Sequence, residues 1–212
     1  RLWGRQHRCR PNIFASPNVG HASFTIEAAA GVKALTDYNG YLPLTAIPDI
    51  VTMNNSHESH YTDFIADGIK HVLGGWHPKG GVARHSLFIE DMRVRNVPTK
   101  LSDITGRMAN GNSMFVFESA DLCVVHISHL HHVLSKQQLG ELGRIDIAFE
   151  PIDGFMTMSH SELFRGLAQI RPKLIIPMHY GWFGAVEEFI EKAKALYPIR
   201  TRDSDTILFS QA

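Results

Sequence analysis

Three short apolar segments of this 212-residue chain each run directly into a loop that contains histidine. The apolar segments are 49–53, 122–125 and 174–177, and the loops that follow them are 54–61, 126–132 and 178–180. Layered folds place their functional groups on loops at strand ends, because a rigid sheet holds those loops in position. Imidazoles that arrive from three separate segments are suited to zinc or iron. The pattern therefore predicts a metal site at the ends of buried strands.

Charge and length exclude several classes of function. Lys+Arg and Asp+Glu both number 21, so the formal net charge is zero, whereas a nucleic-acid binder or a polybasic membrane anchor needs a basic surface. No apolar run approaches the ~20 residues that span a bilayer. Thirteen histidines are more than core packing needs. We therefore expect a small-molecule substrate, with neither nucleic acid nor membrane as partner. A homo-oligomer and either a cytoplasmic or an exported location stay open.

Strand-like patterns dominate the first half of the chain, and alternating strands and helices follow. Strands are predicted over 20–27, 31–37, 49–53, 70–73, 85–89, 92–97, 113–117, 122–126, 145–149, 173–177 and 206–209, and helices over 135–139, 160–170 and 185–196. This order favours a layered α/β protein. Residues 1–18 show no periodicity and are predicted to be an irregular lead-in to a single domain, 19–212.

The order of several motifs resembles the metallo-β-lactamase-fold hydrolases, in the branch related to ascorbate-phosphate lactonase and similar uncharacterised metal-dependent hydrolases. The resemblance covers about residues 18–182 and rests on these segments: Gly-His-Ala-Ser-Phe at 20–24, Leu-Thr-Asp at 35–37, Asn-Ser-His-Glu-Ser-His at 55–60, 111–118, 126–132 and Pro-Met-His-Tyr at 177–180. It implies an α/β fold, the four-layer αββα sandwich, with one or two metal ions at one edge of the sheets.

The resemblance also implies a set of metal ligands, with clear departures from the family pattern. Segment 55–60 lies where the family has His-x-His-x-Asp-His, and the bridging Asp of a later motif is a histidine here. The implied ligands are Asn55, His57, His60, His129 and His179. Ser59 replaces the family Asp, and no histidine stands near 99–101. Because the bridging carboxylate is absent, we expect one divalent ion, zinc first, with a second ion, manganese or iron as alternatives.

Other side chains are expected around this centre. Asp37 is expected to orient the first histidine loop, and His132 or Asp153 to supply a hydrogen bond to a ligand or a proton relay. Asp153 could equally be a turn residue before Gly154. Further residues have two open interpretations, near the site or structural: His21, His126 and His131 as its neighbours, Lys100 and Arg107 as contacts for an anion, and Trp76, Phe155, Tyr180 and Trp182 as pocket lining.

Two functions follow from this pattern. The first is a metal-dependent hydrolase that uses metal-bound water to cleave an ester, lactone, amide or phosphoester. The second is a non-catalytic relative of the same fold that keeps only a metal-binding or ligand-binding site. The four histidines retained at ligand positions favour the first function, and Asn55, Ser59 and Lys100 favour the second.

Overall fold

The computed structural model describes residues 13–17, 22–41, 43–55, 58–103, 106–180 and 184–210. Its elements in chain order are β1 (Ile13–Pro17), β2 (Phe24–Glu27), β3 (Lys33–Leu35), β4 (Ile50–Met53), β5 (His71–Gly74), β6 (Ser86–Ile89), β7 (Met92–Asp103), β8 (Gly106–Ser119), β9 (Leu122–His126), α1 (Lys136–Leu142), β10 (Ile147–Pro151), α2 (His160–Ile170), β11 (Leu174–Met178), α3 (Ala185–Ala193) and β12 (Ile207–Phe209).

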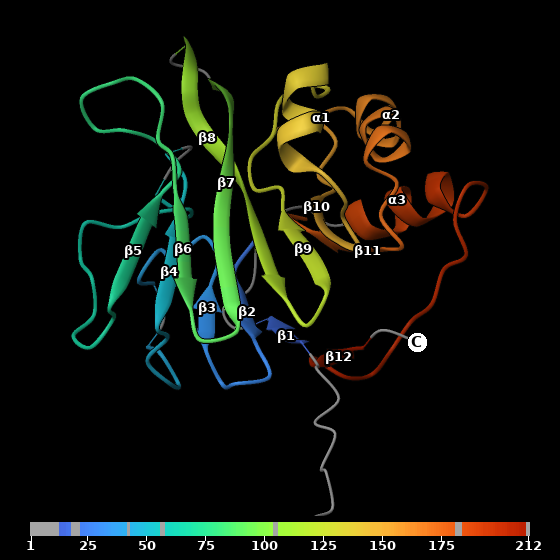
Figure 1. The fold of residues 1–212 in the computed structure, drawn as a ribbon. Helices are drawn as coiled ribbons and strands as arrows, with labels where there is room; N and C mark the ends of the chain where they lie inside the picture. The colour runs from blue at the N-terminus through green and yellow to red at the C-terminus, as the bar shows by residue number, and fades with distance from the viewer. Residues whose placement is uncertain are drawn as a thin grey trace, which may run out of the picture.

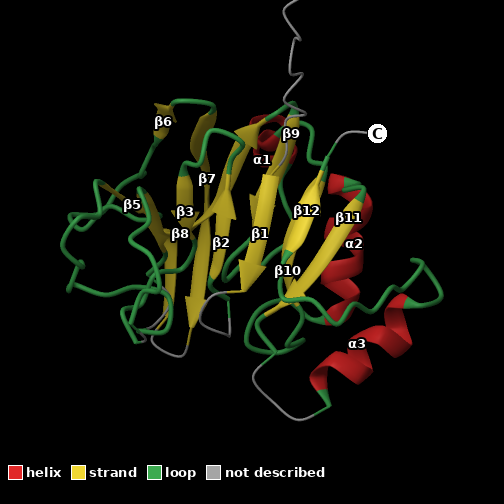
Figure 2. Ribbon diagram, turned by 90° about the horizontal axis from the view of Figure 1, so that it is seen from below, coloured by secondary structure: helices red, strands yellow, loops and turns green. Residues whose placement is uncertain are grey.

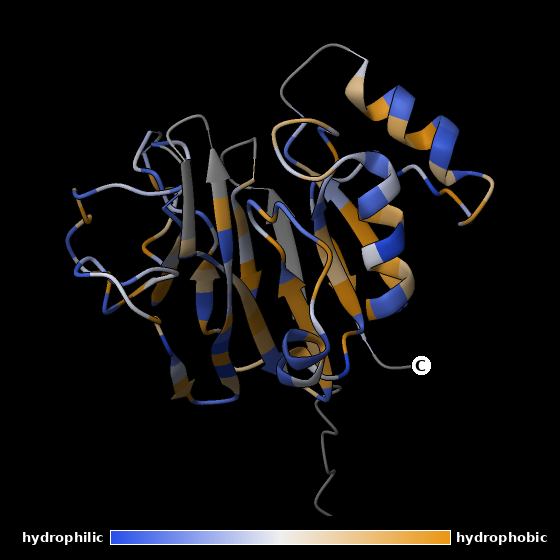
Figure 3. Cartoon of the chain, turned by 90° about the horizontal axis from the view of Figure 1, so that it is seen from above, coloured by the Kyte–Doolittle hydropathy of each residue, from blue (hydrophilic) through white to orange (hydrophobic). Residues whose placement is uncertain are grey.

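Two six-stranded sheets face each other and form a sandwich (Figure 1). The first sheet has the order β12-β1-β2-β3-β4-β5, and the second has the order β11-β10-β9-β8-β7-β6. Alternate residues of both sheets point inward, so Ile26 and Ile50 of the first pack with Phe115, Phe117 and Phe149 of the second. Figure 3 shows apolar residues along the strands of the sandwich. This inter-sheet core holds the two sheets together.

The three helices lie on the outer face of the second sheet (Figure 2). Leu142 of α1 packs against Val116 and Val125, and Leu163 of α2 packs with Phe189 of α3. Both α1 and α2 begin with a capping box, at Ser135 and Ser159. The first predicted helix, 135–139, therefore begins at a serine cap and continues to Leu142.

Loop segments form the layer on the outer face of the first sheet. Leu35 and Val51 point away from the inter-sheet core, and the side chains of Leu44, Tyr61 and Trp76 cover them. Within the described ranges no helix lies on this face. The histidine-bearing loop after β4 is therefore part of the layer that closes this side of the sandwich.

Parallel pairing sets the direction of the strands that precede the histidine loops. β3 pairs in parallel with β4, and β4 with β5, while β9 and β11 each pair in parallel with β10. The carboxyl ends of parallel neighbours lie at the same edge of a sheet. The loops after β3 and β4 therefore leave the first sheet together, and the loops after β9, β10 and β11 leave the second sheet together.

Two predictions from the sequence differ from the structure. The predicted irregular lead-in contains a strand, because Ile13–Pro17 pairs antiparallel with β2 on one side and with β12 on the other. The segment around Lys100, which lies outside the predicted strands 92–97 and 113–117, belongs to a long β7–β8 hairpin with an irregularity between Thr99 and Leu101. In both places hydrogen bonds to residues distant in sequence hold the segment in a strand, although apolar and polar residues alternate little within it.

No helix among the described residues has the length and apolar character needed to cross a bilayer. This finding agrees with the absence of a long apolar run in the sequence.

A buried carboxyl on β10 gives a prediction for stability. The Glu150 side chain is buried on the face beneath the helices, and burial raises its pKa well above the ordinary value. The folded state therefore keeps this proton at pH values where the unfolded chain has lost it, so stability falls as pH rises above about 4.5. We expect Glu150→Gln to raise the melting temperature relative to the parent chain by about 2–4 °C near pH 8, the shift that ~1 kcal/mol gives at this size. The gain should vanish near pH 4. An equal difference at both pH values, in thermal scans, would contradict this account.

A candidate metal centre at the sheet edge

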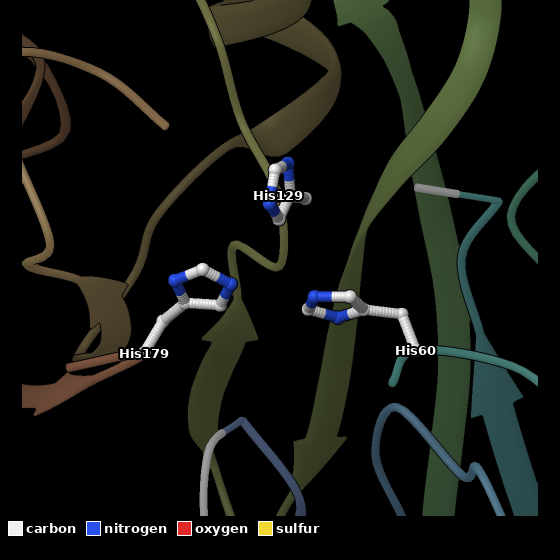
Figure 4. A group of neighbouring side chains, drawn as sticks. All are labelled: His60, His129 and His179. Carbon is white, nitrogen blue, oxygen red and sulfur yellow. The ribbon is translucent and has the colours of Figure 1, made fainter. Parts of the chain in front are cut away.

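Three buried histidine rings meet where the loops after β4, β9 and β11 come together. Coordinating nitrogens of His60, His129 and His179 all lie within 4.8 Å of one another. The ring centroids of His60 and His179 are 5.3 Å apart and nearly parallel, and the His129 ring stands edge-on to both at 5.0 and 4.9 Å. Figure 4 shows the three rings turned toward one shared space. Each histidine follows a different strand, as the sequence pattern predicts.

The backbone turns sharply at the positions that build this centre. Asp37, Ser128 and His179 have φ angles of 42°, 54° and 54°. L-residues other than glycine rarely adopt positive φ, because Cβ then crowds the backbone. Such strain persists only where surrounding contacts enforce it, and it is concentrated at functional sites. Here the turns direct side chains away from the strand axes and into the sheet edge.

The Asp37 carboxylate fixes the orientation of His60. Nδ1 of His60 lies 2.7 Å from Oδ2 of Asp37, and the hydroxyl of Ser128 donates to both oxygens of the same carboxylate. Both Asp37 and His60 are fully buried. A carboxylate with such donors accepts the Nδ1 proton, so Nε2 is the nitrogen that His60 presents to an ion. This contact supports the orienting role expected of Asp37, which stays a prediction.

Asp153 holds His179 in the same way from the second sheet. Nδ1 of His179 lies 3.1 Å from Oδ1 of Asp153. The carboxylate also accepts the backbone N–H groups of Phe155 and Thr157 and the hydroxyl of Thr157. Burial raises the pKa of Asp153, but hydrogen bonds from His179 and Thr157 outweigh it and hold the pKa well below its usual range. A permanently ionised acceptor therefore leaves Nε2 of His179 as the metal-facing nitrogen.

His129 is held by another imidazole. Its Nδ1 lies 2.7 Å from Nε2 of His131, and the two ring centroids are 4.7 Å apart. His129 is buried, whereas His131 is only half-buried. The third ring of the cluster therefore has an imidazole neighbour where the other two have carboxylates.

A buried amide links Asp37 to the opposite sheet. Nδ2 of Asn54 donates to Asp37 Oδ1 at 3.2 Å, and Oδ1 of Asn54 accepts the backbone N–H of Ser113 at 2.7 Å. A Cβ at Gly75 would lie only 2.0 Å from Oδ1 of Asn54. A glycine is therefore required at this position for the amide to reach Asp37. No motif or periodicity in the sequence indicates that Asn54 or Gly75 supports the centre.

The donor set fits a divalent cation. Three imidazoles suit zinc, iron or copper, whereas magnesium and calcium prefer oxygen ligands. Two buried carboxylates, Asp37 and Asp153, lie directly behind two of the rings, and burial raises the pKa of Asp37 even though His126, Asn54 and Ser128 lower it. Buried negative charge is costly unless a positive charge lies nearby. A cation held by the rings would supply that charge, because His60 lies between it and Asp37, and His179 lies between it and Asp153.

Four further residues were predicted at or near the site. Three of them, His57, His21 and Trp182, fall outside the described residues. Asn55 follows β4, and its backbone N–H donates to the carbonyl of Gly111. Their roles stay predictions.

His132 is held by two backbone groups. Its Nε2 accepts the N–H of Lys100, and its Nδ1 donates to the carbonyl of Val133. These bonds occupy both ring nitrogens and fix a neutral tautomer. The predicted proton relay at His132 stays a prediction, and the geometry favours a brace between β7 and the loop after β9.

His126 lies beneath the cluster at the end of β9. It is fully buried, its Nε2 donates to the carbonyl of Ala22 at 2.7 Å, and burial lowers its pKa. His126 therefore joins the two sheets below the site as a neutral ring. His131, in contrast, contacts a member of the cluster directly.

Single ligand substitutions test the cluster. We expect His60→Ala, His129→Ala and His179→Ala each to reduce bound zinc from one ion per chain to a small fraction, because each removes one of three nitrogen donors. His77→Ala, at an exposed histidine, is the matched control and should keep one ion. Elemental analysis of the purified variants after zinc loading and desalting measures the stoichiometry. Full zinc content in all three cluster variants would place the ion elsewhere.

Removing the charge behind His60 tests its orienting carboxylate. Asp37→Asn should weaken zinc binding by about 10- to 100-fold, the usual effect of losing a residue that orients a metal ligand. Asp49→Asn is the control, because Asp49 is on the same sheet but bonds to Lys33 and Lys70 instead. Competition with a chromophoric chelator measures both affinities. Equal affinities in the two variants would show that Asp37 does not act on the site.

Known proteins share both the sequence pattern and the fold. Residues 18–179 match the family described as Beta-lactamase superfamily domain. A UPF0173 metal-dependent hydrolase from Caldivirga maquilingensis is 31% identical over 213 residues, covering 85% of this chain and 89% of that protein. A relative of the same description from Thermoplasma acidophilum is 32% identical over 108 residues, and this match spans 48% of its length.

Solved structures agree with the two-sheet architecture. A candidate Zn-dependent hydrolase of the metallo-β-lactamase superfamily from Thermotoga maritima aligns with a TM-score of 0.61 at 25% identity, covering 85% of each chain. A metallo hydrolase from Ignicoccus hospitalis aligns with a TM-score of 0.65 at 19% identity, covering 95% of this chain and all of that one, which shows the fold alone. The predicted metallo-β-lactamase-type α/β sandwich is confirmed. The chain belongs to the metal-dependent hydrolase family of the β-lactamase superfamily.

Proposed function

We propose that the protein is a hydrolase with a single divalent ion, zinc first, held by His60, His129 and His179. The observation that carries this proposal is the convergence of three buried imidazoles with ionisable carboxylates fixed behind two of them. Three protein ligands with an open fourth position are typical of catalytic zinc sites. When bound, the ion would supply a Lewis acid that lowers the pKa of water toward ~7 and polarises a carbonyl or phosphoryl oxygen.

The residues of the chain would hold the ligands in a fixed orientation. Asp37 and Asp153 each accept the Nδ1 proton of the histidine in front of them, so that Nε2 is the nitrogen aimed at the shared space. Asp37 and His179 both have positive φ angles. Neither side chain can turn away from the site without breaking its hydrogen bonds. This preorganisation supports catalysis, since ligand geometry need not be rebuilt in each cycle.

The absence of a carboxylate from the described cluster supports one ion over two. Two-metal sites need a bridging ligand between ions about 3.5–4 Å apart. His129 stands where the family pattern has its bridging Asp, and an imidazole whose Nδ1 already contacts His131 is poorly suited to bridge two cations. His57 lies outside the described residues, so its predicted part in the ligand set remains to be tested.

The proposed substrate is an ester, lactone, amide or phosphoester. Each of these can be cleaved by water at a single Lewis-acidic ion. Phe155 and Tyr180 are 69% and 53% exposed and directly follow the segments that carry Asp153 and His179. Exposed aromatic rings beside a site support contact with an organic substrate. Zinc is preferred over manganese because imidazole is a better ligand for zinc, and iron stays an alternative.

A non-catalytic metal-binding protein is the second candidate. It is favoured by Ser59, which stands where the family has an Asp that would handle protons, and by the lack of a carboxylate among the three described ligands. In this case the ion would bind with the same ligands and no bond would be cleaved.

Hydrolysis assays separate the two candidates. We expect chelator-treated protein to lose activity toward a panel of lactones, aryl esters and phosphodiesters, and one equivalent of zinc to restore it, because the ion supplies the Lewis acid. His179→Ala should be inactive, and His77→Ala should match the parent chain. Tight zinc binding without hydrolysis of any compound would favour the second candidate. Activity unchanged by chelation and by His179→Ala would refute the proposed hydrolase.

A further inference from the structure

An open cavity of about 710 Å³ lies over the first sheet, beside the loop that carries His60. Residues 38–41, Glu58 and residues 61–66 line it. The hydrogen bond from Nδ2 of Asn39 to the carbonyl of Ser59, at 2.9 Å, ties the two lining segments together. The cavity is therefore defined by two loops that also carry Asp37 and His60.

Aromatic side chains form much of its wall. Tyr38 is 5% exposed and packs on the first sheet, and the Tyr61 ring lies edge-on to Trp76 with centroids 5.5 Å apart. These two rings are held by the core. Tyr41 and Phe64 are 55% and 86% exposed. Large aromatic rings left in water beside a concavity mark a binding surface, because their burial by a ligand is favourable.

The charge of the lining is negative. Glu58 and Asp63 line the cavity, and the described lining residues include no lysine, arginine or histidine. Desolvation and the adjacent Glu58 carboxylate, which accepts a hydrogen bond from the phenol, raise the pKa of Tyr41. Glu58 is therefore held against an aromatic ring. A phosphate or carboxylate ligand would be repelled from this wall.

We propose that this cavity binds an organic ammonium group, because it combines aromatic faces with carboxylates. Aromatic rings attract a cation through the negative potential of their faces, and quaternary ammonium groups are bound by such cages. The two carboxylates add Coulomb attraction without the need for a close ion pair. Magnesium or calcium would need several converging oxygen ligands, whereas much of this wall is apolar. The inference does not depend on the proposed hydrolase function, since His60, His129 and His179 are not among the residues that line the cavity.

Choline and its uncharged carbon analogue 3,3-dimethylbutan-1-ol test this assignment. The two molecules have nearly the same shape and differ in charge. Isothermal titration of the full chain should give binding of choline, with the analogue about tenfold weaker, because it loses the cation–π and Coulomb attraction. The same choline affinity is expected for chelator-treated and zinc-loaded protein, which separates this result from the fate of the hydrolase proposal.

Two exposed substitutions and one control complete the experiment. Phe64→Leu keeps apolar area but removes the ring face, and Glu58→Gln removes one charge. Each should weaken choline binding roughly three- to fivefold, the weight of one exposed cation–π contact or exposed charge pair. Phe88→Leu, at a 70% exposed ring on β6 away from the cavity, should leave the affinity unchanged. The proposal fails if choline does not bind, if the uncharged analogue binds as tightly, or if neither cavity variant differs from the control.

Discussion

A buried carboxylate behind an imidazole sets both the direction and the protonation of the ring, and the candidate site depends on two such pairs. Asp37 and His60 come from the first sheet, and Asp153 and His179 come from the second. Each carboxylate fixes the proton on Nδ1 and so leaves Nε2 for the shared space between the sheets. The negative charge of each carboxylate is stable in a buried position only when positive charge lies close by. The rings and carboxylates thus form an arrangement that favours a bound cation.

The sandwich fold supplies the rigidity that these pairs need. Parallel pairing brings the ends of β3 and β4 in the first sheet, and of β9, β10 and β11 in the second, to the edge that carries the site. The inter-sheet core around Phe115, Phe117 and Phe149 keeps the sheets in register. Asn54 then joins Asp37 to Ser113 across the interface, and His126 joins β9 to Ala22. Small displacements of either sheet would separate the imidazoles. The polar contacts beneath the cluster therefore matter as much as the ligands themselves.

Much of this architecture could be predicted from local sequence, and some of it could not. The strands before the histidine loops are short apolar runs, so the sequence predicted them, and the pattern of an apolar strand followed by histidine predicted that the three loops meet. The individual ligands, Asn55, His57, His60, His129 and His179, were implied only by the resemblance to the family. β1 was missed because its partners, β2 and β12, include the far end of the chain. The predicted strands 92–97 and 113–117 are shorter than β7 and β8, because cross-strand pairing extends the hairpin beyond the segments in which apolar and polar residues alternate.

The supporting residues were harder to predict than the ligands. The contact between His131 and His129 depends on the turn at Ser128, and the support from Asn54 depends on the absence of a side chain at Gly75. Neither dependence leaves a periodic signal in the sequence. Asp153 was visible only as an acid beside a glycine, where a turn and a functional role look alike. The structure shows both contacts, because the carboxylate accepts the backbone N–H of Thr157 in its own turn and also reaches His179.

The position of the ion is the most direct test of this account. Anomalous diffraction from a crystal of the full chain grown with one equivalent of zinc would locate the metal independently of any assay. The account predicts a single strong peak between the loops after β4, β9 and β11, with Nε2 of His60, His129 and His179 each at about 2.0–2.1 Å from it. A peak bound by other side chains, or three rings turned away from an empty centre, would contradict it.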